Sequence, residues 1–343
     1  MDPISQGVLG ACLPQAASER KNLAVAGWIG ALAGMAPDLD VFIRSNNDPL
    51  LFLEYHRQFT HSLIFIPVGA LMCSVVLHWI LGRRYGLSFK LSFWFCLLGY
   101  ATHALLDACT TYGTYLYWPF SDSRIAWNNV FPVDPAFTVP ILLLVLLAAW
   151  KKNPWIARLA LFWAVSYLLF GAVQRDRAEG LGWQMAADQG RLPVSLSAKP
   201  SFANLLVWKI ITETDDRYFV DAVRVGLETE YFPGQSVLKF KIERDLPWLD
   251  PSSQQAKDLE RFRLASRGYI ALDPVRTNRV IDIRYSMLPN QIKPIWSIQL
   301  SPSAKADQHV EYFTEREGSR EAISVLWAML IGSPSLTAIK QSL

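Results

Sequence analysis

Histidine and aspartate residues occur together in the first half of the chain, in combinations that suit divalent metal ions. Imidazole and carboxylate groups together favour zinc, with manganese or iron as alternatives. An ion of this kind lowers the pKa of a bound water to about 7, so hydrolysis is the expected chemistry. The candidate ligands are Asp38, Asp40, His56, His61, His103 and Asp107.

The candidate ligands belong to three short motifs, residues 37–40, 56–62 and 103–107. In the last motif, His103 and Asp107 are four positions apart, so both side chains lie on one face of a helix. Three histidines with two or three aspartates could hold one or two ions. A single HxxxD pair is also typical of a structural hydrogen bond, and an aspartate after proline is typical of a turn. The metal hypothesis therefore depends on all three motifs meeting in space.

Four further residues could take part in the reaction. Asp134 or Asp122 could act as a general base or hold a ligand in place. Arg57 or Arg124 could bind an anionic group such as a phosphate. His78 has no acidic neighbour in the sequence, and we interpret it as a packing or interfacial residue.

Composition indicates a membrane protein. Of the 343 residues, 51% are hydrophobic and 18% are charged, against about 25% charged in soluble domains. The mean hydropathy is +0.17. These values exclude intrinsic disorder and disfavour a purely water-soluble enzyme. A net charge of +3 without a long basic run argues against nucleic acid as a partner.

Six segments are apolar enough to cross or enter a membrane, for which about 20 mostly apolar residues are needed. Four of them are clear spans. The two nearest the N-terminus are shorter and rich in small residues, which suits helices that pack against other helices. The segments are residues 3–17, 23–35, 61–82, 90–106, 136–150 and 155–173.

Loop charges predict the orientation, because loops that carry lysine and arginine face the cytoplasm. Residues 37–60 and 109–135, and the chain after Val173, then lie outside. All candidate ligands then lie at the face of the membrane that points away from the cytoplasm, where ionisable groups are costly and usually functional. The basic loops contain Arg20 and Lys21, then Arg83, Arg84 and Lys90, then Lys151, Lys152 and Arg158.

The chain changes character after residue 175. We expect a multi-pass helical membrane domain over residues 1–175, a linker over 176–194, and a small soluble α+β domain over 195–343 with an antiparallel sheet. Apolar residues at helical spacing predict one helix over 253–264. Near-alternating polarity predicts strands over 205–212, 218–226, 237–243, 279–285 and 295–300.

Several ordered motifs resemble the YdjM-type inner-membrane metal-dependent hydrolases, a bacterial family of unknown function. The resemblance covers about residues 1–175, and the tail is similar to the extra domain of a longer subgroup. Some members have histidine where this chain has Gln6. The motifs are MDPISQGVLGA at the start, PDLD, HRQFTHS, HALLDACTTYGTYLYWPFSDSRIAWNN and VDP.

The resemblance implies a metal-dependent hydrolase of the bacterial inner membrane, and the loop charges then predict that its C-terminal domain lies in the periplasm. The family's distant similarity to zinc-dependent phospholipase C enzymes implies phosphoester or lipid chemistry. A site at the membrane surface also makes membrane lipids natural partners, since they arrive laterally. Two alternatives remain open: a structural metal site with a C-terminal interaction domain, and a metal or ion carrier, although carriers usually bind near the bilayer midplane.

Overall fold

The structure is a computed structural model that describes residues 1–315 and 320–332. The chain divides into two compact units. The first unit contains Met1–Phe42, Tyr55–Val173 and Phe202–Asn204. The second contains Ile43–Glu54, Gln174–Ser201 and the described residues from Leu205 onward.

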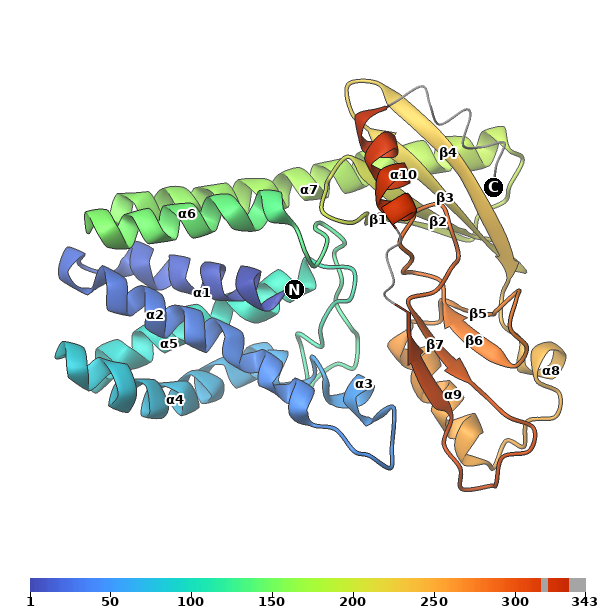
Figure 1. Cartoon of the computed structure of the whole chain (residues 1–343), viewed down its shortest axis with the longest axis horizontal. Coiled ribbons are helices and arrows are strands. Elements are labelled where there is room, and N and C mark those ends of the chain that lie inside the picture. Colours follow the sequence, from blue (N-terminus) through green and yellow to red (C-terminus); the bar gives the residue numbers. More distant parts are fainter. Residues whose placement is uncertain (316–319, 333–343) are drawn as a thin grey trace. The chain divides into compact units, whose positions relative to one another are not determined.

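Helices that lie side by side build the first unit (Figure 1). Four helical stretches are long and apolar enough to cross a membrane: Arg20–Phe42, Leu63–Tyr85, Phe89–Ala108 and Pro154–Asp188. A shorter apolar helix, Pro135–Lys151, and the helix Pro3–Ala17 accompany them, so all six predicted membrane segments are helical. The helices are α1 (Pro3–Ala17), α2 (Leu23–Met35), α4 (Ile66–Leu77), α5 (Phe89–Ala108), α6 (Pro135–Lys151) and α7 (Pro154–Asp188), and α7 belongs to the second unit from Gln174 onward. The short helix α3 (Leu51–Tyr55) lies in the second unit except for its last residue.

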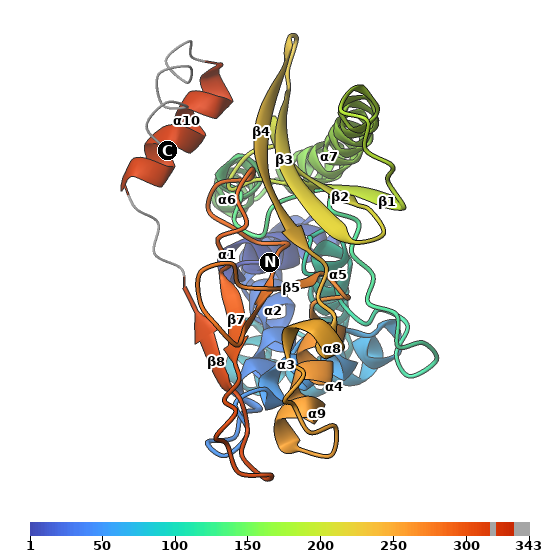
Figure 2. The same ribbon diagram turned by 90° about the vertical axis from the view of Figure 1, so that its right-hand side faces the viewer.

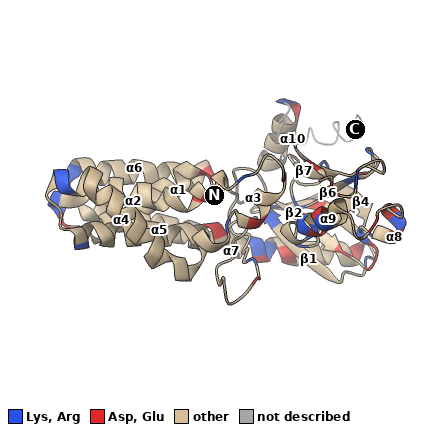
Figure 3. Ribbon diagram, turned by 90° about the horizontal axis from the view of Figure 1, so that it is seen from below, with Lys and Arg blue, Asp and Glu red and all other residues tan. Residues whose placement is uncertain are grey.

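Charge is unevenly distributed along the helices of the first unit. Figure 3 shows lysine and arginine gathered at one end of these helices and a long stretch without charged residues in the middle. This is the end at which α1 meets α2, α4 meets α5 and α6 meets α7. The distribution is what a membrane-embedded bundle with cytoplasmic basic loops requires.

Glycines bring helices α1, α2 and α5 into backbone contact. A Cβ at Gly99 would lie 2.4 Å from the carbonyl oxygen of Gly30, and a Cβ at Gly30 would lie 2.3 Å from the carbonyl oxygen of Gly10. Both distances are too short for a real side chain, so only glycine allows this approach. The contacts fix α2 against α5, the two elements that lead into the motifs at residues 37–40 and 103–107.

The second unit contains two four-stranded antiparallel sheets, with strand orders β1-β2-β3-β4 and β5-β6-β7-β8 (Figure 2). An antiparallel α+β fold was predicted for this region and is confirmed. The strands are β1 (Ser195–Pro200), β2 (Val207–Glu213), β3 (Arg217–Val225), β4 (Thr229–Leu238), β5 (Ile270–Leu272), β6 (Arg279–Asp282), β7 (Trp296–Gln299) and β8 (Glu311–Thr314), with helices α8 (Ile242–Asp245), α9 (Gln254–Ala265) and α10 (Arg320–Ile331).

The segment Ile43–Glu54 belongs to the core of the second unit although it lies early in the sequence. Leu50 and Leu53 are buried among residues of α9 and the second sheet. Arg261 of α9 pairs with Asp48 at 2.8 Å and with Glu54 at 2.5 Å. The loop that connects two membrane helices is therefore part of the C-terminal unit.

Two expectations about the chain after residue 173 differ from the structure. Helix α7 continues to Asp188 through most of the residues expected to form a linker, because no proline interrupts the sequence before Pro193. Residues 237–243 do not form a strand of their own. Strand β4 ends at Leu238 and includes Pro233-Gly234, beside the irregular register between Val220 and Ala222 of β3. A Pro-Gly pair is tolerated there because β4 is an edge strand.

Candidate metal centre

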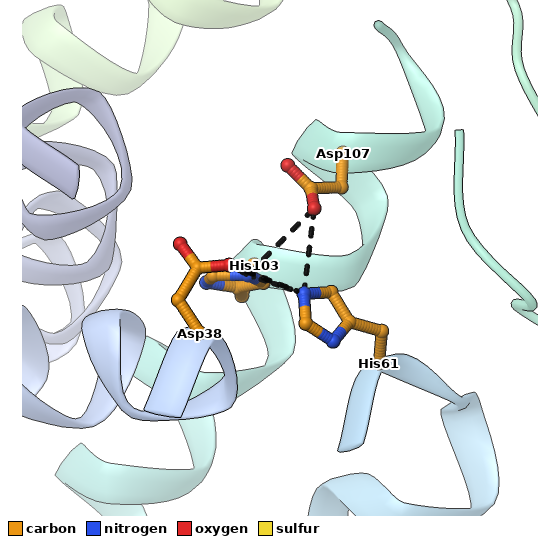
Figure 4. Close-up of side chains that lie close together, drawn as sticks. All are labelled: Asp38, His61, His103 and Asp107. Atoms are coloured by element: carbon orange, nitrogen blue, oxygen red, sulfur yellow. Dashed lines mark hydrogen bonds and ion pairs between the residues drawn. The ribbon is translucent and has the colours of Figure 1, made fainter. Parts of the chain in front are cut away.

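Four candidate ligands from three separate elements converge in the first unit. Asp38 lies in the 3₁₀ turn Ala36–Phe42 that follows α2. His61 ends the 3₁₀ turn Phe59–His61, and His103 and Asp107 lie in the last turns of α5. Figure 4 shows their side chains pointing toward one another. One ligand atom from each lies within 4.8 Å of the other three.

The spacing of these atoms is close to that around a tetrahedral ion. Bonds of about 2.0–2.2 Å separate the donors of such an ion by about 3.3–3.6 Å. Asp38 Oδ1 lies 3.5 Å from His61 Nε2 and 3.4 Å from His103 Nε2. Asp107 Oδ2 lies 3.4 Å and 3.8 Å from the same two nitrogens. The imidazole nitrogens themselves are 2.8 Å apart.

Hydrogen bonds on the far side of each imidazole determine which nitrogen faces the cluster as an acceptor. His103 Nδ1 lies 2.6 Å from the carbonyl oxygen of Gly34, which can only accept, so Nδ1 carries the proton. Thr60 Oγ1 donates to Asp40 Oδ2 at 2.7 Å and therefore accepts from His61 Nδ1 at 2.9 Å. Both Nε2 atoms are then free to bind a cation, which is how metal-binding histidines are oriented in proteins.

The two carboxylates also present oxygens suited to a cation. Asp38 Oδ1 is buried and accepts no hydrogen bond from any described residue, an arrangement that is costly unless a cation compensates it. Asp107 is fully buried. Its Oδ1 accepts a hydrogen bond from Gln6 Nε2 at 2.8 Å and pairs with the Met1 amine, whereas Oδ2 faces the imidazoles. Gln6 thus orients Asp107 by a hydrogen bond.

A second group of three donors adjoins the first and shares Asp38 with it. Asp38, Asp40 and His56 also offer ligand atoms within 4.8 Å of one another. His56 Nδ1 lies 2.7 Å from Asp40 Oδ1. Burial lowers the pKa of His56 even though the hydrogen bond to Asp40 raises it, which favours the neutral imidazole that metals bind. The chain turns sharply after His56, because Arg57 adopts φ +66° and donates its backbone N–H to Asp40 Oδ2 at 2.9 Å.

The two arginines predicted to bind an anion lie close to these groups. Arg57 Nε lies 3.0 Å from Asp107 Oδ2. Arg124 Nη2 donates to the backbone oxygen of His56 at 3.2 Å. Both guanidinium groups stack on the ring of Tyr112, at 4.7 Å and 4.9 Å from its centroid.

The structure places the two predicted bases apart from the two donor groups. Asp134 is the N-cap of α6, where Oδ1 accepts from the backbone of Ala136 at 3.0 Å and Oδ2 accepts from Tyr167 at 2.8 Å. Burial raises the pKa of Asp134. Asp122 is exposed in the loop before α6. These contacts give Asp134 a structural task, and a role as a base stays a prediction for both aspartates.

Sequence reasoning missed the groups that orient the histidines. Thr60 stands directly before His61 in the HRQFTHS motif, so its position next to a candidate ligand was the available signal. The role of the Gly34 carbonyl oxygen could not have been predicted, because every residue has a backbone carbonyl group and the sequence does not show which one accepts a hydrogen bond from His103. His78, by contrast, hydrogen-bonds Ser92 at 2.9 Å, which agrees with a packing role.

The fold and this cluster define a class: a membrane protein with several apolar helices and a largely buried set of aspartates and histidines that could hold a metal ion. Residues 1–178 match the family described as YdjM inner membrane protein. The chain belongs to this family, as its motifs suggested, and it is a multi-pass protein of the inner membrane.

One curated relative is the inner membrane protein YbcI of Escherichia coli (strain K12). It is 34% identical over 100 residues, which are 28% of this chain and 55% of YbcI. The chain thus spans about half the length of the relative it matches. No solved structure matches the chain.

Proposed function

We propose that the protein is a membrane-bound metal-dependent hydrolase that acts at the periplasmic face of the inner membrane. The observation that carries this proposal is the pair of adjoining donor groups. One group has four donors and the other has three, and Asp38 belongs to both. Carboxylates shared between two groups are typical of two-metal hydrolytic sites.

The group of three donors is the proposed place of reaction. Four protein donors complete a tetrahedral shell, as in structural sites, whereas catalytic sites keep a position for water or substrate. The group of Asp38, Asp40 and His56 has only three donors, and the His56 side chain is 19% exposed. A divalent ion bound there would lower the pKa of water to about 7 and supply a nucleophile at neutral pH.

The protein's own side chains would hold this arrangement in place. Asp40 fixes the His56 ring and accepts from Thr60, and Gln6 and Arg57 fix Asp107 from opposite oxygens. The buried four-donor group would then be a permanent anchor for its neighbour. If an ion binds to the four-donor group and none binds to the group of three, the site would be structural. A structural metal site is therefore the competing function.

The position of the ligands along the helices argues against a carrier. Asp38 follows α2 and Asp107 is one residue from the end of α5, so both lie at helix ends. Carriers bind their ions near the midplane.

The parity of membrane crossings supports a C-terminal unit on the same side of the membrane as residues 43–54, which the loop charges predict to be the periplasmic side. Ile43–Glu54 folds with the second unit, so this loop and the second unit share one side of the membrane. Between them lie Leu63–Tyr85, Phe89–Ala108, α6 and α7, and an even number of crossings is needed. Helix α6 must therefore cross too, although it has only 17 residues.

Metal analysis of the detergent-purified full chain tests the proposal, together with hydrolysis assays on phosphoesters, carboxylic esters and phospholipids. We expect two bound divalent ions and a hydrolytic activity that a chelator abolishes. His103→Ala should lose both ions. His56→Ala should lose one ion and all of the activity. His78→Ala is the matched control and should keep metal and activity. A protein that holds one ion, hydrolyses nothing and unfolds on chelation would have the structural site instead.

A further inference from the structure

Arg124 is a buried cation whose hydrogen-bonding capacity is largely unused. The residue is 8% exposed, and its Nη2 donates to the backbone oxygen of His56. Its Nε and Nη1 atoms are buried and have no hydrogen-bond partner within residues 1–315 and 320–332. No carboxylate in these ranges forms an ion pair with it. A buried charge in this condition calls for an anion.

Arg57 differs from Arg124 in this respect. Its Nε pairs with Asp107 Oδ2 at 3.0 Å, and its Nη1 lies 3.4 Å from Thr110 Oγ1. Arg57 is therefore already balanced by a carboxylate of the four-donor group. Among the described residues, the recorded partners of the Arg124 guanidinium are two tyrosine rings, with centroids at 4.9 Å for Tyr112 and 4.7 Å for Tyr115, and the neutral carbonyl group of His56.

Arg124 is held next to the group of three donors. Its contact is the carbonyl oxygen of His56, and the ring of the same His56 pairs with Asp40 at 2.7 Å. A planar guanidinium group binds two oxygens of an oxyanion at once. A phosphoryl group can give two oxygens to the guanidinium and still present a third to a neighbouring cation, whereas a carboxylate has only two oxygens in all.

We propose that Arg124 binds the phosphoryl group of the substrate, so that the substrate class is a phosphoester. The inference rests on the proposed function and specifies its substrate. In the reaction, the water oxygen forms a bond to phosphorus while the ester P–O bond breaks. One water proton passes to the departing alcohol, and inorganic phosphate or a phosphomonoester is left on the arginine. Arg124 neutralises charge on the phosphoryl oxygens and does not exchange protons.

Binding of inorganic phosphate to the purified full chain, measured by calorimetry with and without added zinc, tests this role. We expect Arg124→Gln to weaken phosphate binding at least tenfold and Arg124→Lys to weaken it several-fold, since an ammonium group lacks the planar fork. Arg158→Gln is the matched control: Arg158 also stacks on an aromatic ring, at 4.4 Å from Trp155, and also donates to a backbone oxygen, that of Ala16. It should bind phosphate as the wild type does.

The outcomes separate this inference from the proposed function. Unchanged phosphate affinity in both Arg124 variants would overturn the inference while a metal-loaded, hydrolytic wild type upheld the function. If the purified wild type binds no metal but still binds phosphate, and loses phosphate binding when Arg124 is replaced, the anion site would be upheld. The same result would overturn the proposal that the protein is a metal-dependent hydrolase. Acetate that binds as tightly as phosphate would overturn the phosphoester assignment. If Arg124→Gln fails to fold, as judged by gel filtration, Arg124→Lys decides, because it keeps the buried charge.

Discussion

The Nε2 atoms of His61 and His103 face each other at 2.8 Å although the residues are 42 positions apart. The opposite nitrogens, His61 Nδ1 and His103 Nδ1, donate hydrogen bonds to Thr60 Oγ1 and to the carbonyl oxygen of Gly34. Two lone pairs would therefore point at each other across this gap, which is favourable only if a cation or a proton lies between them. The pair is the clearest single sign that this part of the fold is built around positive charge.

Thr60→Val should weaken metal binding about 10–100-fold while the protein still folds, because groups that orient a ligand typically contribute that much. The substitution keeps the shape of the side chain and removes the hydroxyl that holds His61 and Asp40. Metal titration of the purified protein measures the effect. Thr102→Val is the control, since the Thr102 hydroxyl donates to the carbonyl of Gly99 in its own helix. Equal metal affinity in the two variants would refute the role of Thr60.

Gly99→Ala should destabilise the first unit by about 1–3 kcal/mol, the usual cost of overpacking, because the new methyl group would meet the Gly30 backbone. The displacement of α5 should also reduce metal content. Thermal unfolding in detergent and metal analysis give the two readings. Gly180→Ala is the control: this helical glycine faces open space, and alanine there should leave stability equal or higher. A Gly99→Ala protein that melts like Gly180→Ala would show that α2 and α5 are not in contact.

Arg261→Ala should loosen the segment Ile43–Glu54, since Arg261 joins Asp48 and Glu54 to Asp258 of α9. We expect a loss of about 1–3 kcal/mol from three charge-assisted hydrogen-bonded contacts and faster proteolytic cleavage within the segment. Arg263→Ala is the control, because Arg263 pairs with Glu260 of the same helix and both are about half exposed. Such surface pairs contribute about 0–1 kcal/mol. Identical cleavage rates in the two variants would contradict the assigned packing.

Asn46→Cys and Gly190→Cys should react with a membrane-impermeant maleimide from the periplasmic side, and Lys152→Cys from the cytoplasmic side. All three positions are exposed, and the first two belong to the second unit. The wild type gives the background, because Cys12, Cys96 and Cys109 are buried and Cys73 is partly exposed. Labelling of positions 46 and 190 from opposite sides would show that α6 does not cross.

Stability of the second unit should rise with pH above about 7. Burial lowers the pKa of Lys209 from 10.5 to about 7, and burial with the nearby Arg284 does the same for Lys199. Between pH 7 and 10.5 each lysine is neutral when folded and charged when unfolded. Unfolding therefore takes up protons, and each lysine adds up to about 1.4 kcal/mol of stability per pH unit.

Pulse proteolysis of the full chain in urea at pH 7 and pH 9 measures this dependence. Lys209→Met removes one titrating group and should reduce the slope by about half. A slope that Lys209→Met leaves unchanged would show that Lys209 stays charged in the folded protein.

Much of the membrane unit could be predicted because apolar length and loop charge are local properties of the sequence. The predicted bounds 3–17 and 23–35 are those of α1 and α2, and the motifs around His61 and His103 do meet. The second unit was harder. Strand β5 has three residues and β8 has four, too few for a periodic pattern to emerge. In β4, the bulge and the Pro-Gly pair conceal the strand.

The long-range packing of the second unit could not be predicted. Nothing in residues 43–54 indicates that they fold with α9, because the partner lies 200 positions later and the charge pairs with Arg261 have no local pattern. The choice of Arg124 over Arg57 as the anion-binding group likewise depends on which guanidinium group already has a carboxylate, and only the structure gives that.

The assignment of Ile43–Glu54 to the second unit has a consequence for biosynthesis. At about 5–20 residues per second, a ribosome needs about 10–40 seconds to reach α9 after it has made this segment. During that interval Leu50 and Leu53 have no core to enter, and the stretch between Asp40 and His56 remains unanchored. Chains that terminate before α9 would insert their helices yet leave this stretch open to proteases. The resistance of an early segment to proteolysis would therefore depend on the synthesis of the C-terminal unit.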